Sequence, residues 1–175
     1  MPKLRKMLGR ADSPQSIALM ELIETQSLPT LAAWAVSYAR EHYLPIYEES
    51  CPGDGRFREG LDACRAYLRG ELPQSGLKPT LQGLTLAARE TGHGPVAQAA
   101  ARAIATACSV THSPTGALGF LFYGAAAEAY HQVGLDQPAP VYDRLADDAM
   151  EQALHSLRNA ALPEEAHPVK VRWHC

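Results

Sequence analysis

The chain has 175 residues, a formal net charge of −3, a hydrophobic fraction of 46% and an aromatic fraction of only 7%. This length suits a single domain, and the charge balance gives no reason to expect a nucleic acid or an anionic membrane as partner. Alanine supplies much of the apolar content, which favours helices because alanine loses no side-chain entropy there. The four scattered cysteines form no C-x-x-C pair and are typical of a reduced, cytoplasmic protein.

The first elements follow a short basic arm, residues 1–12, which turns polar at once and therefore does not indicate a signal peptide. Ser13 and the proline after it predict the start of a first helix, since serine caps helix N-termini and proline suits their first turn. A second helix should begin near Pro29. Pro45 should kink or end it, after which IYEES could continue as one more turn.

The turn CPGDG places Asp54 where it can cap a third helix over 56–70. Arginines and acids alternate along that helix, and we expect Asp62 to pair with Arg58, Arg65 or both, which would leave a self-neutralised surface. A fourth helix is predicted around 79–91, ended by two glycines.

Residues 103–127 carry no charge, which raises the question of a membrane span, a buried helix or a ligand groove. Polar residues interrupt the run in its middle, and Ser113 with Pro114 reads as a helix start. We therefore predict two shorter helices, one opening at Pro95 and one at Pro114, each too short to span a bilayer. Their glycines and alanines favour close packing of the two backbones in the middle of a bundle.

A last helix is predicted from about Val141 to Ala161, followed by a tail, 162–175, in which VKVRW could form an edge strand or lie along the surface. No strand pattern of comparable strength occurs elsewhere. We predict an all-α fold in which residues 13–161 form a single-domain bundle of about six or seven antiparallel helices, with a buried small-residue central helix pair.

Few residues have the pattern of a catalytic or metal-binding site. Cys108 and His112 have the spacing of two metal ligands, but the predicted helix ends between them, and His174 with Cys175 could complete a site only by a long fold-back. Ser113 lacks the context of a nucleophile, there is no phosphate-binding loop, and adjacent carboxylates diverge on a helix. We predict no catalytic, metal-binding or cofactor-binding residue, and no cofactor.

The last helix carries an acidic stripe. Asp143, Asp147 and Glu151 recur every fourth residue, Asp148 lies beside them, and Arg144 is the one nearby cation in that segment. Like charges at this spacing repel one another by a few tenths of a kcal/mol, a cost that a basic partner would relieve. The alternative is an ordinary solvated face.

An ordered series of short motifs carries a resemblance to a known family. The series reads WA at 34–35, LPIYE at 44–48, PGD at 52–54, ACRAY at 63–67, RGE at 69–71, AAR at 87–89, AAAR at 99–102, ATA at 105–107 and ALG at 117–119. It resembles the immunity-protein-five-like family of alanine-rich helical bacterial proteins from polymorphic toxin systems. In that family a histidine tends to follow the ATA-type triplet, where Cys108 stands here.

The resemblance implies a cytoplasmic, non-enzymatic protein that neutralises a cognate toxin domain by protein–protein contact, and it supplies no catalytic residue. We assign the contact to Asp143, Asp147, Asp148 and Glu151, which would suit a basic toxin cleft. Two alternatives remain open. One is a small-molecule or metal-binding protein or enzyme with a pocket near Trp34, His112 and Tyr123. The other is a helical scaffold that forms a homodimer through small-residue faces.

Overall fold

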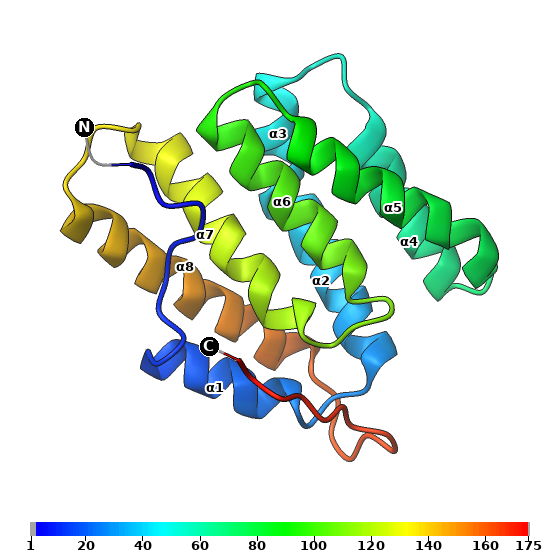
Figure 1. Cartoon of the computed structure of the whole chain (residues 1–175). Helices are drawn as coiled ribbons and strands as arrows, with labels where there is room; N and C mark the ends of the chain where they lie inside the picture. Colours follow the sequence, from blue (N-terminus) through cyan, green and yellow to red (C-terminus); the bar gives the residue numbers. More distant parts are fainter. Residues whose placement is uncertain (1–2, 175) are drawn as a thin grey trace.

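The computed structural model describes residues 3–174, and within that range the regular structure is entirely helical (Figure 1). This confirms the predicted fold class. The helices are α1 (Pro14–Ile23), α2 (Leu28–His42), α3 (Leu44–Ser50), α4 (Arg56–Leu68), α5 (Gln74–Glu90), α6 (Pro95–Ser109), α7 (Gly116–Val133) and α8 (Ala139–Ala160).

The first two helices start where the sequence predicts. The Ser13 hydroxyl accepts a hydrogen bond from the backbone N–H of Ser16 at 3.1 Å, and Ser27 caps α2 in the same manner through Thr30. A proline follows each cap closely, so the backbone is held in a helical conformation from the first turn. α2 ends at His42, before Pro45, and the chain continues in a separate helix, α3, which has Pro45 in its first turn and is longer than the one further turn that the sequence predicts.

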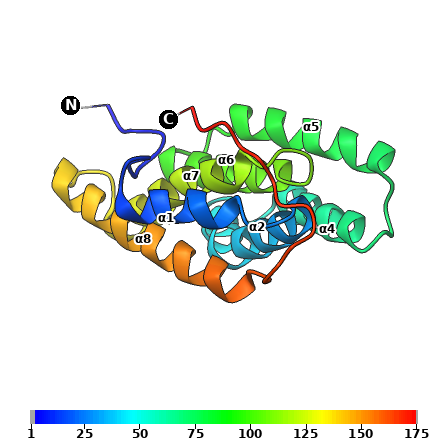
Figure 2. The same cartoon turned by 90° about the horizontal axis from the view of Figure 1, so that it is seen from below.

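The centre of the bundle is the α6–α7 pair (Figure 1). α6 also packs against α2, α3, α4 and α5, while α7 packs against α8, α2 and α1. In the view of Figure 2, α1 and α8 lie on one side of this centre and α4 and α5 on the other. The prediction of a buried small-residue helix pair is confirmed, and the uncharged run is interior structure.

Glycine makes this close packing possible at two places on α7. A Cβ atom on Gly124 would overlap the ring of Tyr43, and one on Gly116 would lie 2.7 Å from the Ser109 hydroxyl oxygen. The small-residue faces of α6 and α7 are therefore occupied inside the chain. The homodimer that the sequence left open stays a prediction.

Two predicted helix starts are wrong. α5 begins at Gln74, five residues early, because a helix tolerates the interior Pro79 at the loss of one hydrogen bond. α7 begins at Gly116, and the Ser113 side chain does not cap it. The chain is still bonded to the end of α6 at this point, where the backbone N–H of Ser113 donates to the Ser109 carbonyl at 2.9 Å.

Two of the arginines of α4 pair with carboxylates outside that helix, Arg56 with Asp54 and Arg58 with Glu48. Asp62 pairs with Arg40 of α2 at 2.5 Å, and Arg58 pairs with Glu48 of α3. The expectation that Asp62 pairs with Arg58 or Arg65 is wrong, because α2 and α3 pack close enough to offer alternatives.

The tail lies along the surface beside α1 and α2 (Figure 2). The backbone N–H of Val169 donates to the Gln26 carbonyl at 2.9 Å, and the Gln26 side chain bonds both the N–H and the carbonyl of Leu162. One isolated bridge joins Ser27 to Pro168. Of the two options for VKVRW, the surface segment is correct and the edge strand is wrong.

Candidate functional site

The acidic stripe lies on the outer face of α8. Its inward residues, from Tyr142 through Met150 to Leu157, are buried against the bundle, so the helical period turns the carboxylates outward. Asp143, Asp147, Asp148 and Glu151 are all exposed.

The basic arm lies across α7 and α8 and brings cations to one edge of this face. An Arg5 guanidinium nitrogen lies 2.8 Å from a carboxylate oxygen of Asp143. The pKa of Arg10 is raised, first by its hydrogen bond to Asp12 and to a smaller extent by Asp147 and Asp143. The repulsion between the carboxylates of the stripe is therefore weaker than the sequence of α8 alone indicates, because arginines of the arm supply positive charge beside them.

Backbone and apolar contacts hold the arm in place. Leu8 is 1% exposed, its N–H donates to the Phe122 carbonyl at 3.1 Å, and the Tyr130 hydroxyl donates to the Arg5 carbonyl at 2.7 Å. The sequence shows the basic composition of this segment but not its position, since a single leucine in a polar stretch gives no sign of burial.

Asp148 faces a groove between α2, α3, α7 and α8 with a volume of about 650 Å³. Its lining includes Ile46 and Leu145, and also His42, whose Nδ1 lies 3.6 Å from a carboxylate oxygen of Glu128. Nearby, the imidazole of His131 bonds Glu49 at 2.7 Å. The groove is thus lined by both apolar and acidic side chains. Its acidic residues are Asp148 of α8 and Glu128 of α7, so negative charge is present on both helices.

Tyr38 lies beneath that groove and stacks on His42, with ring centroids 4.1 Å apart. Its hydroxyl is buried and has no hydrogen-bond partner within residues 3–174. Burial raises the pKa of this phenol well above its ordinary value, and the negative charge of Glu128 raises it further. The phenol is therefore neutral at all ordinary pH values.

Cys108 and His112 are not brought together as ligands. Cys108 is buried beside Cys64, and the pKa of its thiol is raised by a hydrogen bond with Cys64 and by burial, whereas His112 is exposed. Within residues 3–174, no group of three or more His, Cys, Asp or Glu side chains is arranged to hold a metal ion. Cys175 lies outside the described residues.

The three residues of the small-molecule alternative lie apart. His112 lines a hollow beside α5, and Tyr123 lines a different one between α5 and α6. Trp34 is 5% exposed, packs edge-on against Phe120 and donates its indole N–H to the Ser156 hydroxyl at 3.0 Å. Trp34 lines neither of these two hollows.

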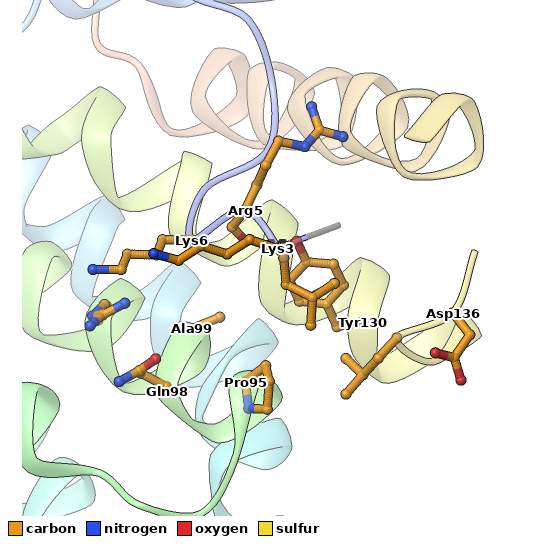
Figure 3. A pocket seen from close by; sticks show the side chains of 11 residues that line it. Lys3, Arg5, Lys6, Pro95, Gln98, Ala99, Tyr130 and Asp136 are labelled. Carbon is orange, nitrogen blue, oxygen red and sulfur yellow. Dashed lines mark hydrogen bonds between the residues drawn. The ribbon is translucent and has the colours of Figure 1, made fainter. Parts of the chain in front are cut away.

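A second charged site lies on the other side of the arm. There the arm and the start of α6 enclose a cleft of about 460 Å³, shown in Figure 3. Lys3 and Lys6 come from the arm, and Gln98 comes from α6, opposite them; Tyr130 of α7 contributes to the lining between them. Arg102 also lines this cleft. Sequence reasoning missed the site because its cations are about 100 positions apart.

None of the helices in residues 3–174 is both long and apolar enough to cross a membrane. The fold and its surfaces define an alanine-rich helical bundle with separate acidic and basic faces. Residues 21–160 match the family described as Imm-5 like putative immunity protein, and the chain therefore belongs to that family. No curated protein and no solved structure gives a significant match.

The matched residues, 21–160, include some parts of the candidate site and leave out others. It includes α8 and all four residues of the acidic stripe, as well as the groove lined by Asp148. The arm, the first part of α1 and the tail lie outside it. The acidic face therefore belongs to the part shared with the family, while the arm that covers one edge of it does not.

Proposed function

We propose that this protein is an immunity protein that binds a cognate toxin domain in the cytoplasm and blocks it by protein–protein contact, without catalysing a reaction. Membership of the immunity-protein family supports the role. The observation that carries the proposal further is the exposed acidic face of α8, within the region shared with the family.

The proposed contact comprises Asp143, Asp147, Asp148 and Glu151. A toxin that acts on an anionic substrate has a basic cleft, and acidic side chains opposite it accelerate association, most strongly at low salt. Because Arg5 already pairs with Asp143, the contribution of Asp143 should be smaller than that of Asp147 and Asp148.

The test uses the toxin domain encoded beside this gene, captured by the purified protein and then studied by association kinetics. The double variant Asp147→Lys with Asp148→Lys should slow association at low salt by about tenfold or more, with a smaller effect at high salt. Glu90→Lys is the matched control, because Glu90 is an exposed acid at the end of α5.

Unchanged association kinetics in the double variant would remove the acidic face from the proposal while leaving immunity intact. Failure of the wild-type protein to bind any adjacent toxin domain, or the absence of such a gene, would count against immunity itself.

A further inference from the structure

The cleft between the arm and α6 has an excess of positive charge. Lys3, Lys6 and Arg102 line it, and Asp136 is the one carboxylate in its lining. Arg5 also belongs to the lining, but its guanidinium group points away from the cleft toward α8, where it pairs with Asp143 (Figure 3). Three cations therefore face a cleft with one opposing carboxylate.

Of the three cations, Arg102 gives the clearest indication of the kind of ligand that the cleft would bind. It is half-buried on α6 and lines the cleft. Within residues 3–174 its guanidinium group forms no hydrogen bond and no ion pair. Most arginines of the α4 region are by contrast paired with carboxylates. A guanidinium presents donors in a planar fork that matches a carboxylate, so Arg102 is suited to receive one from outside the chain.

The cleft is elongated and partly apolar. It adjoins a second hollow of about 430 Å³, which extends to Tyr142 of α8. The two hollows share the apolar or aromatic residues Leu4, Tyr130 and Leu135 and the charged residues Lys3, Arg5 and Asp136. Leu135 is among the exposed large apolar side chains of the molecule. A ligand that follows the whole groove would therefore meet Lys6 and Arg102 at the α6 end, and Ala139 and Tyr142 at the α8 end.

We propose that this groove binds an extended acidic peptide segment of a partner protein, whose carboxylates pair with Arg102, Lys6 and Lys3. The N-terminus of α6, which has no side-chain cap, adds favourable positive potential at the same end. An extended chain suits the groove better than a compact molecule, because the groove runs along three separate elements. The proposed toxin contact on α8 has the opposite charge, so the two proposals are independent.

The test measures binding of a fluorescent, end-blocked peptide with alternating Glu and Leu to the full chain at low salt. The peptide should bind, and its affinity should fall as salt rises. Arg102→Gln should weaken binding about tenfold, since it removes a charge-assisted pair. Lys170→Gln, which removes an exposed cation from the tail, should leave binding unchanged.

Two further arms make the test decisive. An analogue with Gln in place of Glu should not bind, and free acetate at the same carboxylate concentration should not displace the peptide. Lys6→Gln provides an independent variant should Arg102→Gln lower the melting temperature. Equal binding by both variants and wild type, binding of the Gln analogue, or displacement by acetate would each overturn the proposal.

Discussion

Arg5 of the arm and Asp143 of α8 pair at 2.8 Å although 138 positions separate them in the sequence. Their side chains are 48% and 54% exposed, so the pair is well solvated. Exposed pairs of this kind contribute little to stability. The arm is instead anchored three residues later, where Leu8 enters the core between α7 and α8.

The first prediction separates these two contributions. Leu8→Ala should lower the free energy of unfolding by about 2–5 kcal/mol, because it removes a buried side chain and leaves a cavity. Arg5→Gln should change it by less than about 1 kcal/mol. Urea unfolding of both variants checks this. A larger effect for Arg5→Gln than for Leu8→Ala would show that charge, and not apolar burial, holds the arm.

The second prediction concerns two glycines on α7. Gly124→Ala should destabilise the protein by about 1–3 kcal/mol, because the new methyl group would overlap the buried ring of Tyr43. Gly119→Ala is the control, since its Cβ would meet only Thr106 Cγ2 at 3.8 Å, an ordinary contact.

Gly119→Ala should be neutral or stabilising by up to about 1 kcal/mol, because alanine favours a helix more than glycine does. Melting temperatures of the two variants should therefore move in opposite directions, or only that of Gly124→Ala should fall. Equal shifts would contradict the close approach of α7 to Tyr43.

The third prediction tests the polar link between α2 and α8. Ser156→Ala should cost about 1–3 kcal/mol, because it leaves the buried indole N–H of Trp34 without its acceptor. In a Trp34→Phe background, which has no such donor, the same substitution should cost much less. A double-mutant cycle with no coupling between the two positions would show that the hydrogen bond contributes nothing.

Local patterns in the sequence predict this fold better than they predict its surface. The serine–proline signal is correct at Ser13, where the preceding residues are not helical, and wrong at Ser113, where the chain is still bonded to α6. Both positions look alike in sequence. The difference lies in how the previous helix ends, which the pattern does not contain.

The candidate site depends even more on tertiary structure. The carboxylates of α8 follow a helical period and could be predicted, but the Arg5 that neutralises Asp143 comes from the other end of the chain. The positions of Lys6 and Arg102 on one cleft likewise depend on where the arm packs. The sequence shows that these charged residues are present. Which of them lie close together depends on the position of the arm, which is anchored by the burial of Leu8.

The last prediction concerns stability at acid pH. The pKa of Asp54 is held well below its ordinary value, first by the hydrogen bond from the Arg56 side chain and further by one from the Tyr47 hydroxyl. A carboxylate whose pKa is lowered by folding stabilises the folded state above its unfolded pKa of about 4, and this contribution is lost as the pH falls below it. Asp54→Asn should therefore be less stable than wild type near pH 7, and the difference should shrink between about pH 4 and pH 2.

Urea unfolding at pH 7, 5 and 3 measures this difference in stability, with Asp148→Asn as a control that makes the same change in charge on an exposed residue. A stability difference between Asp54→Asn and wild type that stays constant with pH would show that the Asp54 carboxylate is not held ionised by Arg56 and Tyr47.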